Sequence, residues 1–254
     1  LQILSEFLSK YYNKSVILLI DEYDVPMARA TSNGYYKEML EIMKGFMQAL
    51  KDNQCIKLAV ITGCLKIAKE SIFTGTNNFV SNTITSSRLN EYYGFVQNEV
   101  DRILEDAEIK GKGDIMKKWY DGYHFGDVDV YCPWDVMCYV DDLQKNPNAK
   151  PDEYWKDTSD NAIIRSFIDY AGASITKKLE TLMNGGYIIQ RVDENLTYDY
   201  LHSSEENLWS LMYLTGYLTQ VRDYKNDDDW QDNMVALKIP NLEIKQIFET
   251  EVAE

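Results

Sequence analysis

The chain has 254 residues, of which 45% are hydrophobic, and 41 acidic against 26 basic residues give it a formal charge of −15. This composition is typical of a folded globular protein, and an acidic surface repels phosphate backbones, which argues against direct nucleic-acid binding by this region. No apolar run approaches the roughly 20 residues that cross a bilayer, and no signal peptide is recognisable, so we expect a soluble, cytoplasmic protein without a membrane partner.

The first predicted strand is VILLI, Val16–Ile20, and it runs directly into acidic residues: Asp21, Glu22 and, two positions later, Asp24. An uninterrupted run of branched apolar residues predicts a strand that is buried on both faces of a parallel sheet. Ligands of open α/β sheets bind at the carboxyl ends of the strands, where acids can handle a metal ion, a phosphate or an attacking water. The simpler interpretation, a solvated acidic strand end, stays open on this short pattern alone.

A helix and a second strand follow the acids. Residues 36–52 carry apolar side chains, several of them methionine, at the spacing of an amphipathic helix that packs against the sheet. The apolar run at 55–63 predicts a second buried strand, centred on Ile56–Ile61. Strand, helix and strand form a βαβ unit, so the strands should be parallel neighbours with Asp21 and Thr62 at the same edge.

Residues 62–89 are polar and rich in turns, which is typical of a functional loop beside a strand end, and Arg88 lies near the end of this stretch. Amphipathic patterns then predict three helices, and a proline suits the first position of the third. These helices are expected at Gln97–Asp106, at 114–120 and from Pro133 onward.

The proline-containing stretch 145–152 is the expected boundary between an α/β domain at 1–145 and a mainly helical domain at 146–254. A capping box, Ser203 with Glu206, starts one helix of the second domain. Two strand-like runs, expected to pair as a hairpin, precede a final helix, so the C-terminal part is expected to be winged-helix-like. The elements predicted here are helices at 159–171, 174–184 and 203–216, strands at 217–222 and 234–239, and a helix after Asn241.

The acids after the first strand have the form found in nucleoside triphosphatases. Asp21 would orient a magnesium ion, and Glu22 would polarise the water that attacks the γ-phosphate of ATP. Thr62 could hydrogen-bond the same water or the γ-phosphate. Arg88 could supply positive charge to the phosphates, although a solvated loop arginine is the alternative. Asp24 completes the candidate set as a second cofactor-binding carboxylate.

The phosphate-binding half of such a site is not found in the sequence. No GxxxxGKS/T pattern occurs, and Gly111-Lys112 is followed by Gly113. Folds of this kind place the phosphate loop one strand and one helix upstream of the acidic strand, which here lies before residue 1. We therefore expect the chain to be truncated at its start, with Mg²⁺ and ATP bound only when the upstream segment is present.

Six stretches, in this order and spacing, resemble the bacterial AAA-ATPase-like family: VILLIDEYDVPM, LAVITGCLKIAKESIFTG, EYYGF, WYDGYHFG followed by YCPWDV, LWSLMYLTGYLT and IPNLEIKQIF. Such proteins typically join a P-loop ATPase-like region to a C-terminal PD-(D/E)xK nuclease-like domain. The resemblance implies a partial P-loop NTPase-like parallel sheet, with Asp21 and Glu22 as Walker B acids and Thr62 at a sensor-like position. It also implies a regulatory domain that binds Mg-ATP in the full-length protein and controls an attached nuclease-like effector. The family's glycine-rich loop is absent, and the chain stops where the nuclease-like domain would begin.

Two other functions stay open. A non-hydrolysing protein interaction module would use a degenerate nucleotide-binding fold and the winged-helix-like part as a platform. A metal-dependent nuclease built on Asp21, Glu22 and Asp24 is disfavoured, because no lysine follows at the PD-(D/E)xK spacing. The aromatic segments WYDGYHFG and YCPWDV could form an adenine shelf or a partner surface, or could pack between the core and the helical part.

Overall fold

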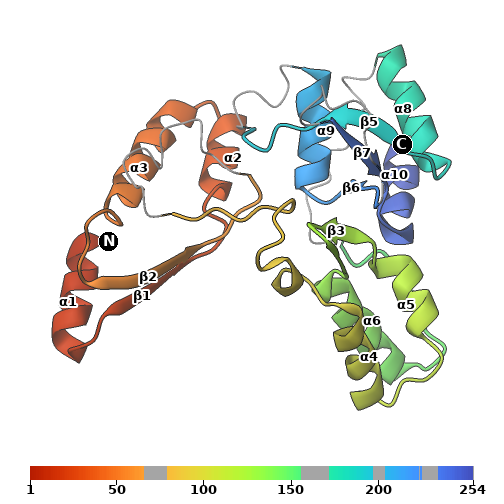
Figure 1. The fold of residues 1–254 in the computed structure, drawn as a ribbon, viewed down its shortest axis with the longest axis horizontal. Coiled ribbons are helices and arrows are strands. Elements are labelled where there is room, and N and C mark those ends of the chain that lie inside the picture. Colours follow the sequence, from red (N-terminus) through yellow and green to blue (C-terminus); the bar gives the residue numbers. More distant parts are fainter. Residues whose placement is uncertain (66–78, 156–171, 197–203, 223, 225–233, 254) are drawn as a thin grey trace. The chain divides into compact units, whose positions relative to one another are not determined.

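The computed structural model describes residues 1–65, 79–155, 172–196, 204–222, 224 and 234–253. The chain forms two compact units, residues 1–81 with 193–211 and residues 82–192 with 212–254. Helices and small sheets alternate along the chain (Figure 1), which confirms the predicted mixed α/β class. The predicted domain boundary after residue 145 lies inside the second unit and stays a prediction. In the part of the chain that is described, no helix is both long and apolar enough to cross a membrane.

The first unit contains a parallel pair of strands. β1 (Val16–Ile20) pairs with β2 (Ile56–Ile61), and Ile20 lies opposite Ile61 at the end of both strands. Parallel strands need a crossover connection, and α3 (Tyr36–Gln48) lies within it, so the predicted βαβ order is confirmed. The sequence interpretation missed α2 (Val25–Ser32), which begins directly after the acids with a proline in its first turn. α1 (Gln2–Tyr12) precedes β1.

The methionine-rich face of α3 packs into the core of the first unit. Met43 and Met47 are buried together with Met27 of α2 and with Tyr23 and Tyr36. Ile20 and Ile61, at the ends of the strands, pack against this cluster. The predicted role of the methionines in core packing is therefore confirmed, since flexible thioether side chains fill the space between helices and sheet.

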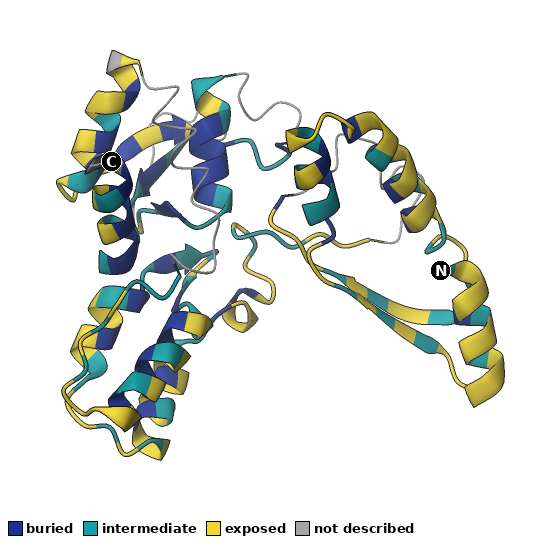
Figure 2. Cartoon of the chain, turned by 180° about the vertical axis from the view of Figure 1, so that it is seen from behind, coloured by how far each residue is buried: buried dark blue, intermediate teal, exposed yellow. Residues whose placement is uncertain are grey.

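The prediction that β1 is buried on both faces is wrong. Ile17 and Leu19 are 60% and 74% exposed, and Leu58 and Val60, which lie beside them on β2, are also exposed (Figure 2). Successive strand residues point to opposite faces, and the cluster around Met43 covers only the face that carries Ile20 and Ile61. Among the described residues, the other face of the two-stranded sheet thus presents apolar side chains to solvent.

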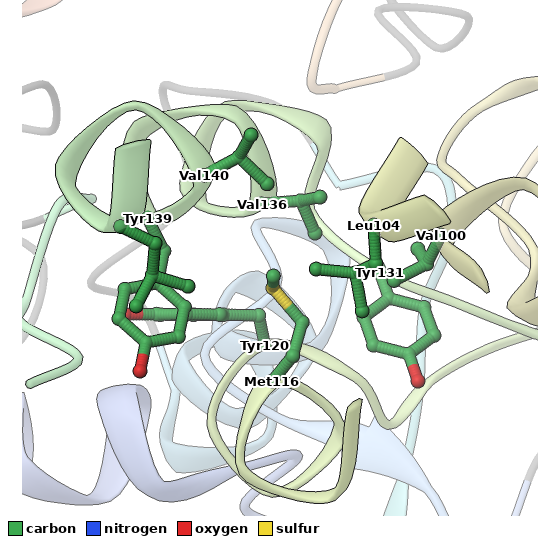
Figure 3. Packing of buried hydrophobic residues seen from close by; sticks show 9 residues of the cluster. Val100, Leu104, Met116, Tyr120, Tyr131, Val136, Tyr139 and Val140 are labelled. Carbon is green, nitrogen blue, oxygen red and sulfur yellow. The ribbon is translucent and has the colours of Figure 1, made fainter. Parts of the chain in front are cut away.

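The second unit contains three helices that pack around aliphatic and tyrosine side chains. Figure 3 shows this cluster, in which Tyr120, Tyr131 and Tyr139 are buried among smaller apolar residues. A short antiparallel hairpin of β3 (Tyr123–Phe125) and β4 (Val128–Val130) connects the second and third helices and was not predicted. The helices are α4 (Gln97–Asp106), α5 (Gly113–Tyr120) and α6 (Pro133–Lys145), close to their predicted bounds, and a short 3-10 turn, η1 (Asn90–Tyr92), precedes them.

The C-terminal part of the second unit is built on an antiparallel sheet of order β5-β7-β6. The predicted pairing of the last two strands is confirmed, whereas β5 was missed because its four residues are too short to show a pattern. The winged-helix-like assignment stays a prediction. The elements are α8 (Ala173–Met183), β5 (Ile188–Arg191), β6 (Thr219–Gln220), β7 (Met234–Lys238) and α10 (Leu242–Ala253). The residues of α9 (Glu205–Leu214) up to 211 belong to the first unit, and the rest of this helix belongs to the second.

Two details of the predicted C-terminal helices need separate mention. The predicted helix at 159–171 and the predicted cap Ser203 lie outside the described residues. The neighbouring Ser204 accepts a hydrogen bond from the backbone N–H of Asn207 at 3.2 Å, which is the contact that a helix N-cap makes.

Gly122 joins α5 to the β3–β4 hairpin and brings this connection against the segment before α10. Its φ of 102° lies in the region that favours glycine, and a Cβ at this position would overlap the carbonyl oxygen of Pro240. A glycine is therefore required here both by backbone conformation and by close approach, which links the WYDGYHFG and IPNLEIKQIF stretches.

Replacement of Gly122 by alanine should destabilise the second unit by about 2 kcal/mol or more, because the new methyl group meets the Pro240 carbonyl and the backbone is strained. Urea unfolding measures this change. Gly113→Ala is the matched control, since a Cβ at Gly113 meets no atom within 4 Å. Equal stability of the two variants would contradict the close packing of Gly122.

Candidate functional site

The carboxyl ends of β1 and β2 bring Asp21 and Thr62 together. The Thr62 backbone N–H donates to the carbonyl oxygen of Ile20 at 2.9 Å, which extends the strand pairing by one residue. The Thr62 hydroxyl then donates a short hydrogen bond to Asp21 Oδ1. The predicted position of both residues at one sheet edge is thus confirmed, while their chemical roles stay predictions.

Glu22 occupies a strained turn directly after Asp21. Its φ is 51°, in the left-handed region that non-glycine residues rarely adopt, and its backbone N–H donates to Asp21 Oδ1 at 3.0 Å. The residue is exposed, so its carboxylate reaches solvent beside Asp21. Strained conformations of this kind persist where the surrounding structure holds them, and they cluster at functional sites.

Asp24 differs from the other two acids because it is buried. It is only 2% exposed, and its carboxylate accepts the backbone N–H groups of Cys64 at 3.2 Å and of Leu65 at 3.0 Å. Both of its oxygens therefore accept hydrogen bonds from the segment that follows β2. Asp21 Oδ2, in contrast, receives no hydrogen bond from the described residues.

Cys64 was not singled out from the sequence, although it lies two residues after Thr62. Its thiol has a raised pKa, first because it is desolvated and then because Asp24, Glu22 and Asp21 are negatively charged neighbours. The three neighbouring carboxylates give this edge of the sheet a negative potential. A bound cation would relieve the potential.

The site fits a hydrated magnesium ion better than a fully protein-coordinated metal. Among the described residues, no three His, Cys, Asp or Glu side chains converge in a way that would hold a metal. Mg²⁺ commonly keeps several waters and binds through one or two carboxylates together with phosphate oxygens, which a single free oxygen of Asp21 satisfies. Arg88 is exposed and belongs to the second compact unit, so its predicted role stays a prediction.

Comparison with known proteins bears on this unit directly. Residues 1–73 match the model of the AAA-ATPase-like family, described as "Predicted AAA-ATPase". This AAA-ATPase-like stretch contains β1, β2 and the candidate residues Asp21, Glu22, Asp24 and Thr62, so the resemblance noted in the sequence is confirmed for this part of the chain.

A curated relative extends the similarity beyond the AAA-ATPase-like stretch. The "Uncharacterized protein in vnfD 5'region" of Azotobacter chroococcum mcd 1 is 26% identical over 235 residues, which are 91% of this chain and 41% of the relative. The chain therefore spans less than half the length of the relative that it matches. No solved structure matches the chain. The predicted nuclease-like domain is not tested by these comparisons.

Outside the AAA-ATPase-like stretch, the second unit holds a buried pair of acids in the motifs YCPWDV and IPNLEIKQIF. Asp135 in the first turn of α6 and Glu243 in the first turn of α10 are both fully buried, and their carboxyl groups are hydrogen-bonded to each other. Apart from this contact, no nitrogen or hydroxyl donor of the described residues reaches Asp135 or Glu243 Oε2. Two carboxyl groups can hydrogen-bond only when one is protonated, so the pair holds one proton.

The proton of this pair is best placed on Glu243. Desolvation, the negative charge of Asp135 and the hydrogen bond between them raise the pKa of Glu243 well above its ordinary value. The Trp155 backbone N–H donates to Glu243 Oε1 at 2.9 Å. Burial also raises the pKa of Asp135, although its hydrogen bond to Glu243 acts in the opposite direction.

The aromatic motifs that the sequence left unexplained surround this pair and a neighbouring cavity. His124 donates its backbone N–H to Thr219 Oγ1 at 2.8 Å, and its ring Nδ1 lies 2.8 Å from Asp129. Tyr123, Cys132 and Trp155 line a cavity of about 210 Å³ with other side chains of the second unit. Close packing within this unit is therefore supported for WYDGYHFG and YCPWDV, whereas an adenine shelf or a partner surface stays a prediction.

The acid pair should make the second unit less stable as pH rises. Above about pH 4.3 the unfolded chain ionises Glu243 while the folded chain keeps its proton, so the free energy of unfolding falls by up to about 1.4 kcal/mol per pH unit until the raised pKa is reached. Glu243→Gln should remove this dependence, because the amide donates to Asp135 and still accepts from Trp155. Urea unfolding between about pH 5.5 and about pH 7.5 measures the difference.

Glu249→Gln is the control for this experiment, since Glu249 is an exposed residue of the same helix, 3.7 Å from Lys245. The control should keep the pH dependence of the original protein. Identical pH profiles for Glu243→Gln and the original protein would show that the pair holds no proton in the folded state.

Proposed function

We propose that the first unit supplies the acidic half of a Mg-ATP site in the full-length protein. The observation that carries this proposal is the hydrogen bond between Thr62 and Asp21, at the shared carboxyl edge of two parallel strands. The match of residues 1–73 to the AAA-ATPase-like family model supports the same conclusion. Asp21 and Glu22 then act as Walker B acids.

Each residue has a distinct task in this proposal. Asp21 holds a water of the hydrated magnesium ion through Oδ2, while Oδ1 is held by Thr62 and by the Glu22 backbone N–H. Glu22 reaches solvent from its left-handed turn and polarises the water that attacks the γ-phosphate. Thr62 reports the state of the γ-phosphate, because its hydroxyl can exchange Asp21 for a phosphate oxygen. Bound magnesium would supply charge neutralisation of the phosphates.

The remainder of the proposal concerns the full-length protein. A glycine-rich phosphate loop outside residues 1–254 would complete the site, and Arg88 would add positive charge. The ATPase-like unit would regulate an attached nuclease-like effector. The chain matches only 41% of its curated relative, which leaves room for both parts in a protein of that length.

A non-hydrolysing interaction module is the second candidate function. The exposed apolar side chains of Ile17, Leu19 and Leu58 favour it, because an apolar sheet face is a suitable surface for contact with another protein segment. This candidate requires no catalysis by Glu22, and the same experiment separates the two functions.

In the full-length protein, Glu22→Gln should lower ATP turnover about 100-fold or more while ATP binding persists, because the amide keeps the size of the side chain but cannot polarise the attacking water. Asp21→Asn should instead weaken the magnesium-dependent part of ATP binding. Steady-state turnover and calorimetric titration with and without magnesium measure these effects.

Glu38→Gln, at an exposed position in the first turn of α3, is the control and should behave as the original protein. Undiminished turnover in Glu22→Gln would exclude the catalytic role. If none of the variants altered magnesium-dependent binding or hydrolysis, the interaction module would replace the ATPase as the preferred function.

A further inference from the structure

Asp24 lies at the start of α2, but it does not cap its own helix. It occupies the N-cap position and makes no side-chain hydrogen bond to the first turn. Its carboxylate instead crosses to the segment after β2 and accepts the N–H groups of Cys64 and Leu65. A buried carboxylate that satisfies two backbone donors in another segment ties the two segments together.

Tyr23 and Gly63 also bring the segment after β2 close to Asp24. The Tyr23 backbone N–H donates to the Thr62 carbonyl at 3.0 Å, and the Tyr23 hydroxyl donates to the Leu65 carbonyl at 2.6 Å. A Cβ at Gly63 would lie 2.5 Å from Asp24 Oδ1 and 2.6 Å from the Tyr23 ring. The chain therefore approaches Asp24 as closely as its backbone allows.

These contacts bracket Thr62. On one side Thr62 continues the strand pairing through Ile20. On the other side Tyr23 and Asp24 make hydrogen bonds to Cys64 and Leu65. The hydroxyl of Thr62, in contrast, lies on an exposed residue whose side chain has few neighbours to hold it. The direction of this hydroxyl toward Asp21 thus depends on how the backbone after it is fixed.

We propose that Asp24 is a positioning residue that fixes residues 62–65 and so holds the Thr62 hydroxyl against Asp21. Its consequence for catalysis rests on the proposed ATPase function, while its effect on the backbone does not. Asp24 thereby acts from beneath the site and contacts neither nucleotide nor metal. This role differs from the cofactor-binding role predicted from the sequence.

Hydrogen exchange of the Cys64 and Leu65 amides tests the positioning itself. In Asp24→Asn one of these two N–H groups faces an NH₂ group instead of an oxygen, so at least one amide should exchange about tenfold faster or more. Amides in β1 and β2 should keep their protection, which shows that the sheet stays folded. Asp52→Asn, at an exposed aspartate of the same unit, should leave the exchange of both amides unchanged.

Gly63→Ala provides a second route to the same outcome if Asp24→Asn does not fold. The added methyl group displaces the segment from Asp24 without removing the carboxylate. Faster exchange of Cys64 and Leu65 in this variant supports the proposal. Unchanged exchange of both amides in every variant that folds overturns it.

ATP turnover of the full-length protein tests the catalytic consequence. Asp24→Asn should lower kcat about tenfold with little change in the KM for ATP, because Thr62 is misdirected while the nucleotide contacts remain. The effect should be much smaller in a Thr62→Ala background, where there is no hydroxyl to direct.

The outcomes separate this proposal from the proposed function. If Glu22→Gln abolishes turnover but Asp24→Asn does not lower kcat, the positioning role is overturned and the ATPase function stands. If the amides exchange faster in Asp24→Asn while Glu22→Gln leaves turnover unchanged, the positioning of the segment is supported and the ATPase function fails.

Discussion

The parallel pairing of β1 with β2 is the constraint on which the candidate site depends. Asp21 and Thr62 are separated by 41 positions in the chain, and they meet because parallel strands end at the same edge of a sheet. Without this pairing, Asp21 and Glu22 would be only a solvated acidic strand end. The crossover between the strands contains α2 and α3, and methionines of both helices fill the space beneath the site.

The site combines a negative potential with a left-handed turn. Glu22 adopts a left-handed conformation, and the nearby acids help to raise the pKa of Cys64. Asp24 is kept out of solvent and is satisfied by two backbone N–H groups of the facing segment. A buried carboxylate is tolerated when its hydrogen bonds are made, so aspartate is accommodated both at the exposed position 21 and at the buried position 24.

The second unit also buries carboxyl groups, but their hydrogen bonds are satisfied in a different way. Asp135 and Glu243 are both removed from water, but they satisfy each other by sharing a proton rather than by accepting several N–H groups. Such a pair is stable only while the proton stays, which ties the stability of this unit to pH. The motifs WYDGYHFG, YCPWDV and IPNLEIKQIF converge through Gly122 and this pair, and that explains their density of aromatic and acidic residues in structural terms.

The sequence by itself determined the strands Val16–Ile20 and Ile56–Ile61, their parallel order and the shared edge of Asp21 and Thr62, because apolar runs and crossover rules are local and strong signals. It also determined the start of α6 at Pro133, since proline favours the first turn of a helix. Only the tertiary structure decided that Asp24 is buried beneath the site, that Ile17 and Leu19 face solvent, and that Asp135 meets Glu243. Each of these depends on contacts between residues far apart in the chain, and the local spacing of residue types carries no information about such contacts.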